Sequence, residues 1–119
     1  MNWGAVAAGL LALAVMLGAF GAHGLRDRLD AYSMDVYQKA VFYHFAHALG
    51  MLAVALSPRT AHLVWVNVLL AAGIAIFSGS LYLLAVTGVR ALGAITPVGG
   101  LAFIAAWVLL AWSLARGKA

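Results

Sequence analysis

The fold is decided by the stretch KAVFYHFAHALG, which runs from Lys39 to Gly50 and carries ionisable side chains into an apolar segment. Two of its histidines, His44 and His47, are three residues apart. On a helix such residues lie on neighbouring parts of one face, and Tyr43 lies beside them. This is the one place in the sequence where we expect ionisable groups to enter a membrane.

The overall composition predicts that lipid surrounds the chain. Of its 119 residues, 66% are hydrophobic and only 8% are charged, whereas soluble domains carry roughly 25% charged residues. A short chain buries a smaller fraction of its surface than a long one, so a soluble fold of this size leaves too much apolar surface in water. We therefore expect an integral membrane protein with membrane lipids as its neighbours.

The charged residues and the absence of cysteine exclude several classes of function. Seven basic and three acidic residues give a net charge of +4. The basic residues are scattered near the ends of apolar segments and form no patch or stripe, so we expect no nucleic acid partner. Because the chain has no cysteine, disulfides, thiol catalysis and cysteine-bound metal sites are excluded.

Four apolar segments predict an all-α polytopic protein, a compact bundle of four transmembrane helices in a single membrane-embedded domain, residues 1–119. About 20 helical residues cross the ~30 Å of hydrocarbon in a bilayer. Small residues such as Gly50, Gly79 and Gly99 are expected where two helices approach closely. The spans are predicted at about 3–23, 40–56, 60–86 and 94–114.

The ends of these segments carry local signals. Ser57 and Pro58 predict an N-cap and a first-turn proline for the third helix. The third span is long enough to tilt, or to bend near residues 78–80, and Gly88 can terminate it. Pro97 either opens the fourth helix or kinks it.

The first span has a rival interpretation as a cleaved signal peptide, because residues 19–21, Ala-Phe-Gly, resemble a cleavage site. The residues before it include no lysine or arginine and the apolar core is long, which favours a retained span.

All three acidic residues lie in the connection between the first two spans, residues 24–38. Leu25, Leu29, Tyr32 and Val36 recur there at roughly helical spacing, which is typical of a short amphipathic helix in the headgroup plane. An irregular solvated loop is the alternative, because so short a segment gives a weak periodic signal.

Membrane orientation is not fixed by the charges. An even number of crossings divides the basic residues three against four: Arg59, Arg116 and Lys118 with the termini, and Arg26, Arg28, Lys39 and Arg90 on the other side. So small a difference does not decide orientation by the positive-inside rule. On the second side we expect a belt of interfacial tyrosines, Tyr32, Tyr37 and Tyr43.

Four short motifs follow one another along the chain: FGAHGL from Phe20, YHFAHAL from Tyr43, FSGSLY from Phe77 and ITPVGG from Ile95. In this order they resemble the bacterial domain-of-unknown-function 423 family, whose eukaryotic relatives are called transmembrane protein 256-like. The resemblance covers nearly the whole chain. It implies a small multi-pass protein of the bacterial inner membrane, and it supplies no enzyme activity and no catalytic residue.

Three histidines raise the hypothesis of a metal or haem site. His23 closes the first span, and His44 and His47 open the second, so all three belong to one membrane side. Three imidazoles can bind zinc or copper, and two can hold haem iron. The favoured alternative is that His47 hydrogen-bonds a carbonyl or a serine of a neighbouring helix. We therefore expect no cofactor, with metal or haem as the alternative.

The sequence carries no catalytic set, so we expect no enzyme. The favoured function is a non-enzymatic structural or accessory membrane component that forms a homo-oligomer or joins a larger membrane complex. A weaker alternative is a lipid or small-solute binder in a groove between the third and fourth spans. The polar residues expected to bond between helices are Tyr43, His47, Ser78, Ser80, Tyr82 and Thr96.

Overall fold

The computed structural model describes residues 1–58 and 61–117. Within these residues all regular structure is helical, as the sequence predicts. The elements are α1 (Trp3–His23), α2 (Ala31–Ala55), α3 (Ala61–Gly73), the π-helical turn η1 (Ile74–Ser78), α4 (Gly79–Thr87), the 3₁₀ turn η2 (Arg90–Ala94) and α5 (Thr96–Ala115).

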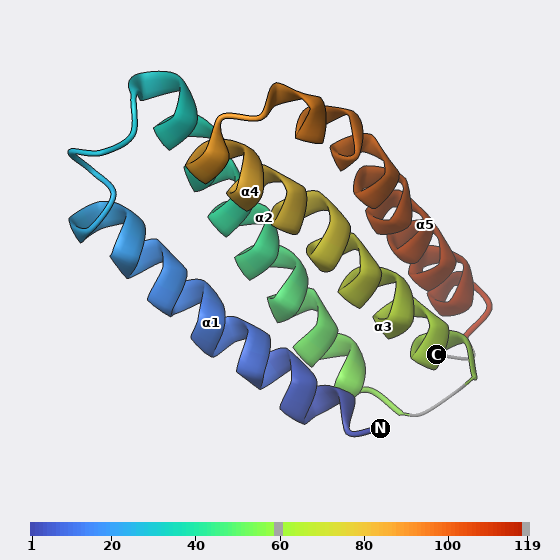
Figure 1. Ribbon diagram of the computed structural model, residues 1–119. Helices are drawn as coiled ribbons and strands as arrows, with labels where there is room; N and C mark the ends of the chain where they lie inside the picture. Colours follow the sequence, from blue (N-terminus) through green and yellow to red (C-terminus); the bar gives the residue numbers. More distant parts are fainter. Residues whose placement is uncertain (59–60, 118–119) are drawn as a thin grey trace.

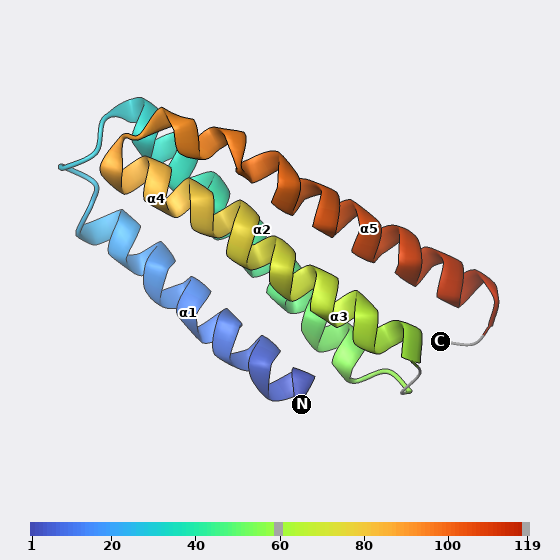
Figure 2. The ribbon, with the colours of Figure 1, turned by 45° about the vertical axis from the view of Figure 1, so that its right-hand side comes forward.

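The helices run side by side in chain order as an elongated bundle of 49 × 26 × 21 Å (Figures 1 and 2). α2 packs against α1 on one side and against the continuous rod of α3, η1 and α4 on the other. α5 packs on that rod, so α1 and α5 are the two edges of the bundle (Figure 2). α1 begins and α5 ends at the same end of the bundle (Figure 1).

Three helical segments are long and apolar enough to cross a membrane: Trp3–His23, His62–Thr87 and Arg90–Ala115. The predicted second span, residues 40–56, lies almost entirely within α2, but α2 is not among these segments. Charged and polar side chains in α2, among them Lys39, His44 and His47, lower its mean hydropathy below that of the other three segments. The fold is therefore all-helical with three candidate spans.

α2 begins earlier than the predicted second span because Asp30 caps it. The Asp30 carboxylate accepts a hydrogen bond of 2.7 Å from the backbone N–H of Ser33. This bond holds the pKa of the exposed Asp30 carboxyl below its ordinary value. The connection after α1 is thus a short turn through Asp30, and Tyr32 lies in the first turn of α2.

Several helix ends follow the sequence signals and one does not. Gly88 adopts the left-handed conformation (φ 73°) and ends α4, and Pro97 stands in the first turn of α5 without kinking it. The Ser57 hydroxyl, by contrast, donates to the carbonyl of Ala53 at the end of α2 (3.0 Å). Arg59, the predicted start of the third span at residue 60, and Lys118 lie outside the described residues.

Of the glycines predicted to lie at close contacts between helices, one does not. A Cβ at Gly79 would meet no atom within 4 Å, so the prediction that Gly79 marks a close helix contact is wrong. The close contact lies at Gly99 of α5, where a Cβ would come 2.8 Å from the Cα of Phe77 in η1. A Cβ at Gly50 would meet the Trp107 ring at 2.7 Å, so Gly50 does allow a close approach.

Candidate functional site

His44 lies at the centre of the bundle and is 2% exposed. Its Nε2 is 2.9 Å from the carbonyl oxygen of Leu10 in α1, and its Nδ1 is 2.8 Å from the hydroxyl of Tyr82 in α4. Because a carbonyl only accepts, Nε2 carries the proton, and the neutral ring accepts at Nδ1 from the Tyr82 hydroxyl. One side chain of α2 thus joins α1 to α4.

Tyr37 makes a second bond of the same kind, two helical turns before His44. Its hydroxyl donates to the carbonyl of Leu17 at 2.5 Å, and its ring packs edge-on against Tyr82 with centroids 5.5 Å apart. The two acceptors on α1, Leu10 and Leu17, are also two turns apart. We call Tyr37, His44 and Tyr82 the central polar cluster.

The predicted position of Tyr37 at the membrane interface is wrong. Tyr37 is 3% exposed and not part of an interfacial belt. The seven-residue spacing from His44 was the available signal, because residues seven apart share one helix face.

Three hydroxyl groups form two more ties between helices. The Ser78 hydroxyl, fully buried, donates to the carbonyl of Ala40 in α2 at 2.9 Å. The Ser80 hydroxyl donates to the carbonyl of Phe77 (2.9 Å), so the Thr96 hydroxyl is the donor in its 2.6 Å bond to Ser80. The first tie joins η1 to α2 and the second joins α4 to α5.

His47 and Tyr43 take part in ring contacts, and within the described residues no hydrogen bond from either side chain to another helix is found. The Nδ1 of His47 donates to the carbonyl of Tyr43 in its own helix at 2.8 Å. Its ring stacks on Phe103 of α5 with centroids 3.6 Å apart. Tyr43 packs on Phe77 (4.6 Å) and is 37% exposed, at the outer edge of this group of rings.

Within the described residues, the structure does not bring together the three histidines of the hypothesised metal site. His23 lies thirteen residues beyond Leu10, about 20 Å along α1 from the carbonyl to which His44 donates. Both ring nitrogens of His44 already have partners. Among the described residues, no three His, Cys, Asp or Glu side chains gather in a group that could hold a metal ion.

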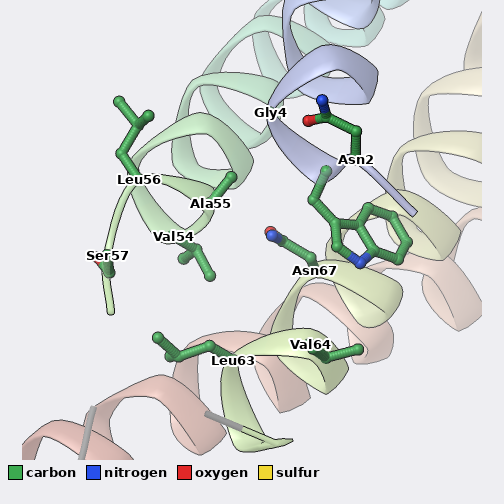
Figure 3. A pocket seen from close by; sticks show the side chains of 10 residues that line it. Asn2, Gly4, Val54, Ala55, Leu56, Ser57, Leu63, Val64 and Asn67 are labelled. Atoms are coloured by element: carbon green, nitrogen blue, oxygen red, sulfur yellow. The ribbon is translucent and has the colours of Figure 1, made fainter. Parts of the chain in front are cut away.

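A half-open pocket of about 130 Å³ lies where α1 begins and α2 ends (Figure 3). We call it the terminal pocket. α1, α2 and α3 all contribute to its wall. The side chain of Asn67 extends from α3 toward the space between the other two helices (Figure 3). The lining residues are Asn2, Trp3, Gly4, Val54, Ala55, Leu56, Ser57, Leu63, Val64 and Asn67.

Asn67 is the polar side chain of this pocket that lacks its full set of partners. It is 2% exposed, and its Oδ1 is buried with no hydrogen-bond partner in the described part of the chain. From the sequence, Asn67 is one of the few polar residues of the third span that a proton relay could use, a role that we do not favour because the apolar spans contain no carboxylate. A single asparagine in an apolar helix carries no pattern, so only the three-dimensional arrangement could identify it.

A second cavity, of about 180 Å³, lies between α1 and α2 toward their connection. Its wall includes Gly18, Met34, Gln38 and Val41. Both cavities differ in place from the groove between the third and fourth spans that the sequence analysis considered, since neither is lined by Ser78 or Tyr82.

Comparison with known proteins places the chain in a family. A family model described as "Protein of unknown function (DUF423)" matches residues 17–100. The UPF0382 membrane protein SSP2132 of Staphylococcus saprophyticus is 49% identical over 100 residues, which cover 82% of this chain and 83% of the relative. The UPF0382 membrane protein YwdK of Bacillus subtilis is 48% identical over 102 residues, with coverage of 82% and 83%.

No solved structure matches the chain. The family match spans most of the bundle, from the second half of α1 into the first turns of α5. It confirms the resemblance seen in the four sequence motifs. The chain therefore belongs to the DUF423 family, whose members here are bacterial membrane proteins of unknown function.

Proposed function

We propose that the chain crosses the bacterial inner membrane four times and acts as a non-enzymatic structural or accessory component. α2 is the additional crossing. Its 25 residues span about 37 Å, more than the ~30 Å of hydrocarbon. It packs between two segments that are apolar enough to cross a membrane, so the buried side chains of Tyr37, His44 and His47 are shielded from lipid by protein.

This proposal rests on one observation: buried polar groups form hydrogen bonds between helices. Tyr37, His44 and Ser78 each bond to a group on another helix. A polar group inside a membrane bundle is stabilised by such bonds, and the bonds in turn select one packing of the helices. That use supports a structural role, in which the arrangement of the helices is itself the functional property.

The partner surface of this proposal is the outer face of an edge helix. α5 exposes a row of large apolar side chains at helical spacing, among them Leu101, Ile104 and Val108. α1 exposes Met16 in the same way at the opposite edge. We propose that one of these faces packs against a second copy of the chain or against another protein of a membrane complex.

Because the chain has no cysteine, single cysteines test this surface without background. We expect Ile104→Cys or Met16→Cys, oxidised in native membranes, to give a disulfide-linked dimer or a larger adduct. Ala106→Cys is the matched control, because Ala106 is fully buried in α5. A monodisperse monomer in mild detergent, with no adduct from either exposed position, contradicts the proposal.

The proposal also expects no stoichiometric metal or haem, because both nitrogens of His44 serve the helix contacts. Elemental analysis and an absorption spectrum of the purified protein check this expectation. Bound metal that is present in the wild type and lost in His44→Phe and His47→Ala contradicts it.

A further inference from the structure

Asn67 lines the terminal pocket, and its buried amide oxygen has no hydrogen-bond partner among the described residues. A single water needs at least about 10 to 15 Å³ of space, so the pocket of about 130 Å³ holds several waters or a group of several heavy atoms. A buried amide oxygen without a partner is unfavourable, because it has lost its water and gained nothing in return. Asn67 Oδ1 is in that state.

The missing partner must be a hydrogen-bond donor, since a carbonyl oxygen only accepts. The ten described residues that line the pocket include no ionisable side chain. A charged donor such as an ammonium group would therefore find no counter-charge among these residues. The chemistry of the wall favours a neutral donor, and a hydroxyl group is the simplest one.

The surroundings of the pocket favour a ligand with an apolar body. Val54, Leu63 and Val64 form much of its wall. Leu56, at the same site, is 77% exposed, and Val64 is 43% exposed. In a membrane these side chains contact acyl chains, so a ligand can place its polar end beside Asn67 and its chain along them.

We propose that the terminal pocket binds the neutral, hydroxyl-bearing head of a membrane lipid of the acylglycerol class, with a hydroxyl of the lipid donating to Asn67 Oδ1. This inference goes beyond the proposed structural role. It requires only that this end of the bundle contacts lipid, so it does not depend on which partner covers α1 or α5.

The test uses the full chain in phosphatidylcholine nanodiscs that contain a diacylglycerol with a photoreactive diazirine near its glycerol. We expect illumination to label the segments around Val54 and Asn67. Unlabelled diacylglycerol should compete. An acyl-matched ester without a hydroxyl, and free glycerol, should not. We expect Asn67→Leu to reduce labelling roughly five- to thirtyfold, the effect of losing one membrane-buried hydrogen bond.

Ser113→Ala is the matched control for the loss of a polar group. The Ser113 hydroxyl is also buried without a partner among the described residues, but it does not line the pocket. Its removal should leave the labelling unchanged. In detergent without diacylglycerol, Asn67→Leu should be at least as stable as the wild type, because it removes an unpaired amide.

A further variant fills the terminal pocket and keeps the Asn67 amide, and it has its own control. A Cβ at Gly4 has room, with its nearest neighbours at 3.5 and 3.9 Å, so the side chain of Gly4→Leu can extend into the pocket. Gly9→Leu is its control on the same helix, where a Cβ meets nothing within 4 Å. We expect Gly4→Leu to abolish labelling and Gly9→Leu to leave it unchanged.

Three results overturn the proposal. The first is equal labelling of the wild type, Asn67→Leu and Gly4→Leu, which means that the labelled lipid does not occupy the pocket. The second is competition by the ester without a hydroxyl as strong as that by diacylglycerol, which removes the role of the donor. The third is equally strong competition by free glycerol, which assigns the pocket to a small polyol in place of a lipid.

Discussion

The contact of α2 with α1 and the contact of α5 with the central rod are built on different principles. Between α1 and α2, side-chain donors of His44 and Tyr37 bond to backbone carbonyls of the facing helix. Between α5 and the rod, the backbones themselves approach at Gly99 and Phe77, and the ring of Phe103 in α5 packs on the ring of Phe77 with centroids 5.4 Å apart. The first contact depends on directional bonds to backbone carbonyls. The second depends mainly on close packing, with one hydrogen bond, between Thr96 and Ser80, where α5 begins.

The two contacts therefore fix different features of the bundle: the first fixes the register of two helices, and the second fixes the distance between them. A donor that reaches a carbonyl fixes the sliding of α1 along α2, since a shift by one residue breaks both bonds together. A glycine that admits a neighbouring backbone fixes distance, because any Cβ there must displace main-chain atoms. We therefore expect substitutions at the second contact to cost more than those at the first.

Gly99→Ala should have the largest effect. The added Cβ would lie 2.8 Å from the Cα of Phe77, and backbone cannot rotate away as a side chain can. We expect a loss of about 3 kcal/mol in stability, at the upper end for overpacking, measured by SDS titration in mixed micelles. Gly100→Ala is the control, because a Cβ there has ordinary contacts of 3.7 Å or more. Equal losses in both variants contradict the packing account.

His44→Phe should come next. It keeps a ring of similar size but leaves the hydroxyl of the half-buried Tyr82 without its present acceptor. We expect a loss of about 2 kcal/mol, and a double-mutant cycle with Tyr82→Phe should show coupling, because both variants break the same bond. Strictly additive losses mean that the bond contributes nothing to stability.

Tyr37→Phe tests the contribution of a single hydroxyl to the contact between α1 and α2. It removes the donor to Leu17 and keeps the ring, so we expect a loss of about 1 kcal/mol. Tyr43→Phe on the same helix is the control, because no hydrogen bond from the Tyr43 hydroxyl is found in the described residues. SDS titration of both variants checks this difference, and a larger loss at Tyr43 overturns the assignment of Tyr37 to the central polar cluster.

Asp30→Asn should have the smallest effect on stability, and that effect should depend on pH. The pKa of Asp30 is lowered in the folded protein, so its contribution is fully present above about pH 4, the unfolded value, and is lost as the pH falls through the lower folded value. Asparagine also caps helices but does not titrate. We expect Asp30→Asn to keep its stability in acid better than the wild type in thermal melts, whereas Asp27→Asn should follow the wild type.

The sequence predicted the helices well because length and hydropathy determine them. α1 occupies the predicted range 3–23, and α5 is displaced from its predicted range by only one or two residues. The predicted start of the second helix was the least accurate, because the Asp30 cap starts α2 nine residues before the predicted span. Capping by a single carboxylate is a local signal that hydropathy does not contain.

The partners of the polar side chains were harder to predict. Tyr82 and Ser80 have polar partners in His44 and Thr96, whose side chains are visible in the sequence. Leu10 and Leu17, in contrast, contribute backbone carbonyls, which every residue has, so no residue type marks them. The pocket at Asn67 was likewise unpredictable, because three helix ends must come together to form it.

In the four-span arrangement that we propose, α2 crosses the membrane between α1 and the rod of α3, η1 and α4. Arg28→Cys and Ser57→Cys place single thiols just before and just after α2. In sealed inverted and right-side-out vesicles, a membrane-impermeant maleimide should label one position from one side only and the other position from the opposite side only. Labelling of both positions from the same side would contradict the four-span arrangement.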